Sequence, residues 1–104
     1  MEAASEKQAE DIILLDLRNI SSFADYFVIC TAGSSHQVQA VCEEIELRLS
    51  REGVRLLHSE GTFDSGWILL DYGTTVVHIF SPEEREYYQL EKMWYNANLV
   101  VRIQ

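Results

Sequence analysis

Basic residues are scarce in this chain of 104 residues, which has 8 Lys and Arg against 17 Asp and Glu and a formal net charge of −9. Proteins that bind nucleic acids or anionic membranes gain much of their affinity by neutralising phosphates with Lys and Arg. The charge therefore argues against direct nucleic-acid specificity and against a membrane partner, and it would steer the chain toward a protein with a basic surface. From charge alone, a merely solubilising acidic surface is the simpler explanation.

The chain also lacks the signs of a disulfide framework, a membrane span or a targeting peptide. Its two cysteines, Cys30 and Cys42, fall in a predicted strand and on the apolar face of a predicted helix, which is typical of buried free thiols. No apolar run approaches the roughly 20 residues that cross a bilayer. The start, "MEAASEKQAED", is polar and acidic, unlike a secretory signal or an Arg-rich transit peptide. We therefore expect a cytoplasmic protein.

No repeat or low-complexity tract divides the chain, so we expect a single domain of 1–104. Within it, 1–10 should be a short or partly disordered N-terminal segment and 97–104 a C-terminal extension. Apolar and β-branched runs predict strands at 11–17, 25–32, 54–59 and 99–103, with two more inside 67–80. The strand at 54–59 follows a helical crossover and should therefore run parallel to the strand before that helix.

Two segments have the period of an amphipathic helix. The first starts at a cap on Ser34 and ends at Gly53. Its apolar stripe consists of Val38, Val41, Cys42, Ile45 and Leu49. The second starts at Ser81, with Pro82 at the first helical position, and should reach about Asn96. The side chains that it should bury are Tyr87, Leu90 and Trp94. Together these elements predict an α/β fold, a mixed β-sheet packed with helices.

The stretch "WILLDYGTTVVHIF", residues 67–80, reads as two strands joined by a tight turn at "DYGT". Side chains alternate between the faces of a strand, so a two-residue turn sorts the hairpin into two sets. The core set is Ile68, Leu70, Tyr72, Thr75, Val77 and Ile79. The other set is Trp67, Leu69, Asp71, Val76, His78 and Phe80. A three-residue turn would instead group Trp67 with the second strand's core residues.

The second set mixes large aromatic residues with an acid and an imidazole. Buried Asp and His side chains each need a partner, so we expect this face to be at least partly open. Exposed Trp and Phe are typical of protein-docking surfaces. A C-terminal helix that covered the face would instead make Trp67 an ordinary core residue.

Nothing in the residue spacing assembles a catalytic or metal site. The three histidines are scattered singly, and none is spaced to activate a Cys or Ser. The Gly33-Ser34-Ser35 loop lies at a strand-to-helix junction, where backbone N–H groups can bind an anion, and nucleotidyltransferases carry a similar Gly-Ser loop. The Asp-x-Asp pair that holds two Mg²⁺ ions in such enzymes is missing. We expect no catalytic residue, metal or cofactor, and a nucleotide-binding or nucleotidyl-transferring enzyme using this loop is the alternative.

Four stretches resemble, in this order, the Iojap or ribosomal silencing factor (RsfS) family: "DYFVICTAGSSHQVQAVCEEIE", "EG", "WILLDYGTTVVHIF" and "PEEREYYQLEKMW". The resemblance covers about 7–95. It implies a fold similar to nucleotidyltransferases but without their catalysis. It also implies a translational repressor that binds the large ribosomal subunit through ribosomal protein L-fourteen and blocks joining of the small subunit under nutrient limitation. Organelle relatives are further linked to biogenesis of the large subunit.

Carried over by position, the resemblance implies a partner-binding surface on the hairpin, formed by Trp67, Leu69, Asp71, Tyr72, His78 and Phe80. Asp25 in "ADYF" and Glu60 in "EG" also match family positions. We expect Trp67 and Phe80 to anchor a protein partner, and Asp71 or Glu60 to meet a Lys or Arg. The same apolar face closing a homodimer of the free protein is a further alternative.

Overall fold

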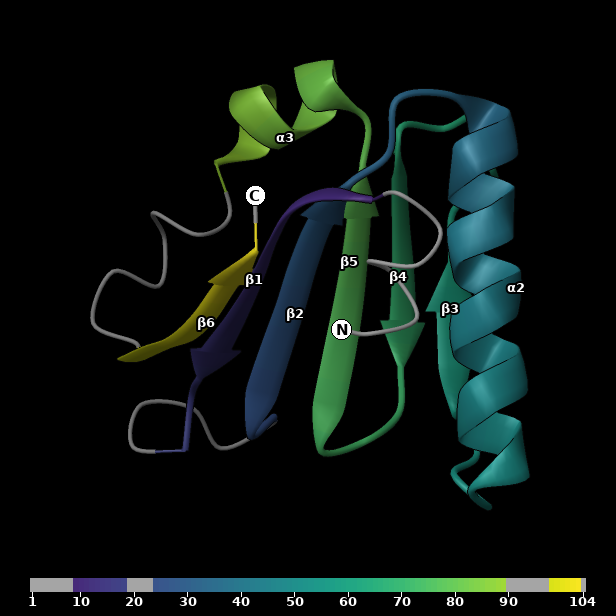
Figure 1. Ribbon diagram of the computed structural model, residues 1–104, viewed down its shortest axis with the longest axis vertical. Helices are drawn as coiled ribbons and strands as arrows, with labels where there is room; N and C mark the ends of the chain where they lie inside the picture. Colours follow the sequence, from purple (N-terminus) through teal and green to yellow (C-terminus); the bar gives the residue numbers. More distant parts are fainter. Residues whose placement is uncertain (1–8, 19–23, 90–97, 104) are drawn as a thin grey trace.

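The computed structural model describes residues 9–18, 24–89 and 98–103. In this part of the chain, six strands form one sheet in the order β3-β4-β5-β2-β1-β6 (Figure 1). The strands are β1 (Glu10–Asp16), β2 (Tyr26–Thr31), β3 (His58–Glu60), β4 (Trp67–Asp71), β5 (Thr75–Phe80) and β6 (Asn98–Ile103). β2 and β5 are parallel at the centre, and the other neighbours are antiparallel. The predicted mixed sheet of an α/β fold is confirmed.

β3 is shorter than the predicted strand at 54–59. The Val54 N–H donates to the Leu49 carbonyl at 2.8 Å, which keeps the start of this segment attached to the end of the preceding helix. Pairing with β4 begins only near Leu57, whose N–H donates to the Asp71 carbonyl at 2.9 Å. β3 runs in the same direction as β2, as predicted, but it lies at the edge of the sheet and not beside β2.

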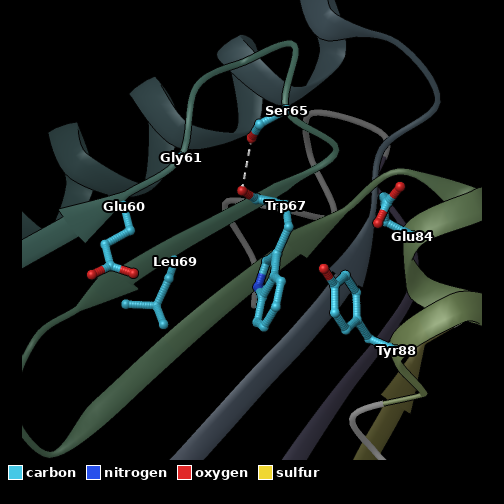
Figure 2. A pocket seen from close by; sticks show the side chains of 7 residues that line it. All are labelled: Glu60, Gly61, Ser65, Trp67, Leu69, Glu84 and Tyr88. Atoms are coloured by element: carbon cyan, nitrogen blue, oxygen red, sulfur yellow. Dashed lines mark hydrogen bonds between the residues drawn. The ribbon is translucent and has the colours of Figure 1, made fainter.

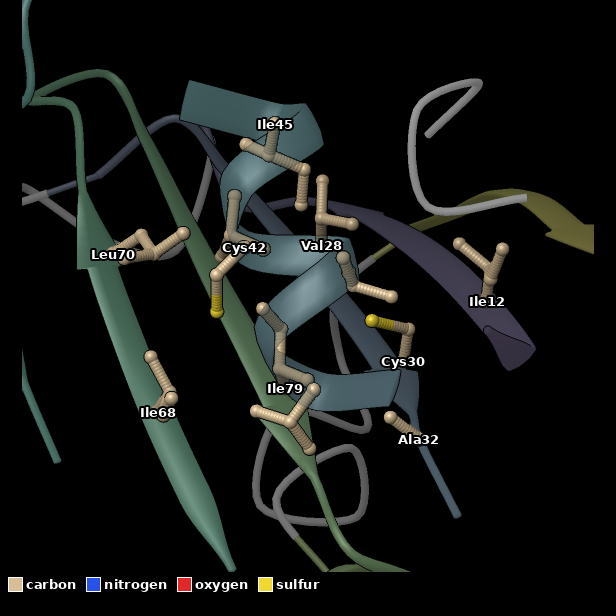
Figure 3. Close-up of a cluster of buried hydrophobic side chains, with 12 residues drawn as sticks. Ile12, Val28, Cys30, Ala32, Cys42, Ile45, Ile68, Leu70 and Ile79 are labelled. Carbon is tan, nitrogen blue, oxygen red and sulfur yellow. The ribbon is translucent and has the colours of Figure 1, made fainter. Parts of the chain in front are cut away.

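The helix α2 (Ser35–Arg51) covers one face of the sheet. It begins as predicted, because the Ser34 hydroxyl accepts the Gln37 N–H at 3.2 Å, and Gly53 after its end has a φ of +79°. Its stripe buries Val38, Val41, Cys42 and Ile45 against β4 and β5, with Leu49 partly buried beside them (Figure 3). Both cysteines are free and buried, and burial raises the pKa of each thiol to about 12.

The opposite face of the sheet carries a second apolar core. This core contains Ile13, Leu15, Leu17, Ala24, Phe27, Ile29, Val76 and Phe80. Residues 67–80 divide between the two cores as the two-residue turn predicts: Trp67 pairs with Phe80, and the Tyr72 N–H donates to the Thr75 carbonyl at 2.9 Å. Gly73 has a φ of +91°, which suits the first turn position of such a hairpin.

The helix α3 (Pro82–Tyr88) is shorter than predicted, because Gln89 adopts a φ of +45° and ends it well before Asn96. Its start is as predicted, with the Ser81 hydroxyl accepting the Glu84 N–H at 3.2 Å. Tyr87, predicted to be buried, is 79% exposed. Arg85 takes the sheet-facing position, and a residue two places on lies about 200° around the helix and points away. The other two predicted core residues, Leu90 and Trp94, lie outside the described residues.

Neither α2 nor α3 is long and apolar enough to cross a membrane, and this finding extends only over the described ranges.

Candidate functional site

A hollow of about 300 Å³ opens where β4 begins and α3 starts (Figure 2). It is lined by Glu60, Gly61, Ser65, Trp67, Leu69, Glu84 and Tyr88. These residues come from the end of β3, the loop that follows it, the start of β4, and α3. The hollow thus combines two aromatic rings and a leucine with two carboxylates, and none of its lining residues is basic.

The loop between β3 and β4 packs closely on the backbone beneath Trp67. The Ser65 hydroxyl donates to the Trp67 carbonyl at 2.9 Å, as Figure 2 shows. Gly61 has a φ of +94°, and a Cβ atom at this position would collide with the same carbonyl. The "EG" dipeptide is therefore explained by close packing of its glycine, which places Glu60 at the rim of the hollow.

Trp67 is half-buried at the centre of an aromatic cluster. Its ring stacks on Phe80 with 4.9 Å between centroids and 26° between planes, and the Tyr88 ring lies 4.6 Å away on α3. Phe80 itself is fully buried. Trp67 therefore packs on the sheet through Phe80 and against α3 through Tyr88.

His78 fixes the orientation of the indole from beneath. The Trp67 Nε1–H donates to His78 Nδ1 at 3.1 Å, and His78 is only 3% exposed. Burial lowers the pKa of His78 to about 4, so the ring is neutral near pH 7 and carries its proton on Nε2. Because the indole N–H is engaged inside the protein, Trp67 offers a partner its apolar ring.

The acidic residues predicted for the surface do not all lie at the hollow. Glu60 is at the hollow, where its carboxylate also meets the His58 ring at 2.9 Å. Asp71 lies four residues beyond Trp67, about 13 Å along the strand. Its carboxylate accepts the Gly73 N–H at 2.8 Å and so supports the turn. Asp25 is near that same turn, because its N–H donates to the Thr74 carbonyl at 2.7 Å.

The structure thus brings three of the eight predicted residues to one hollow: Trp67, Leu69 and Glu60. The expectation of an at least partly open face holds for Trp67, Leu69 and Asp71, which are half-buried, but it is wrong for Phe80 and His78. The latter two are buried, because Phe27, Trp67 and Phe80 pack around the imidazole and the indole N–H satisfies its Nδ1. Tyr72 lies on the opposite face, where it packs against the core under α2.

The two lining residues on α3, Tyr88 and Glu84, were missed from the sequence, as was Ser65 in the loop before β4. Tyr88 follows Glu84 by one helical turn, a spacing that places both on one side of α3. That spacing was the available signal. It could not identify a site by itself, because the position of α3 against Trp67 depends on tertiary packing.

The Gly33-Ser34-Ser35 loop serves as a helix cap. Ser34 caps α2, and the Gly33 N–H donates to the Gln37 side-chain oxygen at 2.7 Å. Across the described ranges, no group of three or more His, Cys, Asp or Glu side chains is arranged to hold a metal ion.

Comparison with known proteins identifies the group to which this chain belongs. The sequence model of the family described as "Ribosomal silencing factor during starvation" matches residues 1–104. The chain belongs to the ribosomal silencing factor family. It is similar to the ribosomal silencing factor RsfS of Bacillus subtilis, with 45% identity over 97 residues that cover 93% of this chain and 82% of the relative.

Members of the ribosomal silencing factor family and their relatives share both sequence and fold with this chain. The chloroplast protein Iojap of Zea mays is 37% identical over 95 residues, covering 91% of this chain and 41% of the relative. A crystal structure of a protein from Chromobacterium violaceum superimposes with a TM-score of 0.85 at 34% identity, covering 89% of this chain and 78% of that one. The resemblance seen in the motifs is confirmed.

We predict that His78 makes stability depend on pH. Its folded pKa of about 4 lies below the usual value of 6.5, so the unfolded chain binds the proton first as the pH falls. Between pH 7 and pH 4 this group should remove up to about 3 kcal/mol from the free energy of unfolding. Urea unfolding at a series of pH values measures the loss.

The His78→Gln variant should lack this part of the pH dependence, since glutamine does not titrate. His36→Gln is the matched control, because it removes a histidine that is exposed at the start of α2. Equal slopes in wild type and His78→Gln between pH 6.5 and pH 4.5 would contradict the assignment of a buried neutral imidazole.

Proposed function

We propose that this ribosomal silencing factor represses translation by docking the hollow around Trp67 onto ribosomal protein L-fourteen of the large subunit. The bound factor then prevents the small subunit from joining when nutrients are limiting. The observation that carries the proposal is the hollow itself: a half-buried Trp67, fixed by His78 and flanked by Leu69 and Tyr88, has the composition of an interaction hot spot. No catalytic step is part of this function.

The charge distribution supports a protein partner. Glu60 and Glu84 line the hollow, and a net charge of −9 disfavours direct binding to ribosomal RNA. In the proposed complex, the apolar rings bury surface on L-fourteen while the carboxylates meet Lys or Arg side chains at the rim. Asp71 and Asp25, at the other end of the hairpin, are secondary candidates for such contacts.

Two exposed glutamates of α2 have a separate part in the proposal. The helix covers the face of the sheet opposite Trp67, so its exposed Glu43 and Glu46 stay outside the docking contact. Pointing away from L-fourteen, they would repel the phosphates of an approaching small subunit and add to the steric block. Docking and blocking would then depend on different residues.

We predict that Trp67→Ala weakens co-sedimentation with large subunits about 30-fold, the usual effect of losing a central aromatic anchor. Leu57→Ala is the matched control, because Leu57 is a 63% exposed apolar side chain that does not line the hollow. Circular dichroism verifies that both variants are folded. If a folded Trp67→Ala variant binds large subunits like the wild type, the docking role is contradicted. If this variant instead dissociates a dimer of the free protein, Trp67 belongs to a homodimer contact.

Charge reversal separates docking from blocking. Glu60→Lys and Glu46→Lys change the net charge equally, but only Glu60 lines the hollow. We expect Glu60→Lys to weaken binding to large subunits about 10-fold, because a rim carboxylate is replaced by a repelling cation. We expect Glu46→Lys to bind normally and to inhibit subunit joining less. Equal effects of the two variants on binding would show that only the overall charge matters.

A further inference from the structure

A buried arginine attaches α3 to the sheet. Of the seven residues of α3, Arg85 alone is buried, at 7% exposure, and no apolar side chain of this helix is buried. The Arg85 guanidinium donates through Nη1 to the Asp11 carbonyl at 2.5 Å and to the Thr31 hydroxyl at 2.9 Å. Its Nη2 lies 3.4 Å from the Asp11 carboxylate. Arg85 thus joins α3 to the first residues of β1 and the last residue of β2.

The backbone of Asp11 is shaped for this contact. Asp11 has a φ of +45°, a left-handed conformation that only a few residue types tolerate, and the register of β1 against β2 shifts between Glu10 and Ile13. Bulges of this kind redirect backbone groups out of the regular ladder. Here the redirected carbonyl accepts from Arg85.

The same helix supplies one wall of the hollow. Tyr88 follows Arg85 by three residues, so the two side chains lie on neighbouring positions of one helix surface. Arg85 points down to β1 and β2, while the Tyr88 ring packs at 4.6 Å on Trp67 and at 6.3 Å on Phe80. Gln89 ends the helix directly afterwards. The position of Tyr88 is therefore set by the attachment one turn earlier.

We infer that Arg85 is a positioning residue of the docking site: anchored on the Asp11 bulge, it holds Tyr88 against Trp67 and so gives the hollow its shape. The inference rests on the proposed function, because it assigns Arg85 a part in docking without direct contact to the partner. A purely structural arginine would contribute to stability alone and would leave docking by the folded protein unchanged.

A double-mutant cycle tests this role. Arg85→Met replaces the guanidinium by an apolar chain of similar length, and Tyr88→Ala removes the wall. Each single variant should bind large subunits about 10-fold more weakly than the wild type. The double variant should bind no more weakly than Tyr88→Ala, because Arg85 acts through Tyr88. Glu86→Met, at an exposed position of the same helix, is the matched control and should bind normally.

A second readout needs no ribosome. In the wild type, nuclear Overhauser effects should connect the Tyr88 and Trp67 rings, and in folded Arg85→Met they should be lost or strongly weakened. If Arg85→Met does not fold, Thr31→Val takes its place, because it removes only one hydrogen-bond partner of the guanidinium. The nuclear Overhauser effects between Tyr88 and Trp67 should then be weakened to a smaller extent.

Retained ring-to-ring effects in Arg85→Met, or fully additive losses in the double variant, would overturn the inference. Failure of the proposed function has a different signature, since Trp67→Ala would then bind large subunits like the wild type whatever Arg85→Met does.

Discussion

The register of the β4–β5 hairpin determines which face of the sheet almost every side chain near the site occupies. With Trp67 opposite Phe80, the aliphatic set faces α2 and the aromatic set faces the second core. A slip of one residue would exchange the two sets, placing Trp67 under α2 and removing the floor of the hollow. The two-residue turn at Gly73 therefore determines the proposed docking surface as well as the fold.

The sequence pattern was sufficient for those features that depend on local periodicity. The α2 stripe from Val38 to Ile45, its cap at Ser34 and the sorting of residues 67–80 all follow from periods of 3.6 or 2 residues, and the structure confirms them. Exposure does not follow from periodicity. His78 and Phe80 lie on the predicted face, yet they are buried, because their accessibility depends on how Trp67, Phe27 and α3 pack over that face. The contact of Arg85 with Asp11 spans 74 positions of the chain and has no local signal.

Two buried residues hold the aromatic side chains that line this hollow. His78 orients Trp67 from inside the sheet, and Arg85 places Tyr88 from the side. Both supporting residues are buried, and their polar contacts contribute to the rigidity of the site. For a factor proposed to work by occupying a place on the large subunit, such rigidity reduces the entropy lost on binding. Membership in the ribosomal silencing factor family and the acidic rim agree with a basic ribosomal protein as the partner.

In the proposed complex, the hollow around Trp67 faces ribosomal protein L-fourteen. Site-specific photo-crosslinking tests this arrangement most directly: benzoylphenylalanine replaces Tyr88 at the hollow in one variant and the exposed Leu57 in another. After irradiation with purified large subunits, mass spectrometry identifies the attached molecules. We expect the Tyr88 probe to attach to ribosomal protein L-fourteen and the Leu57 probe not to attach to it. Attachment of the Tyr88 probe to ribosomal RNA or to another ribosomal protein, with L-fourteen unlabelled, would contradict the proposal.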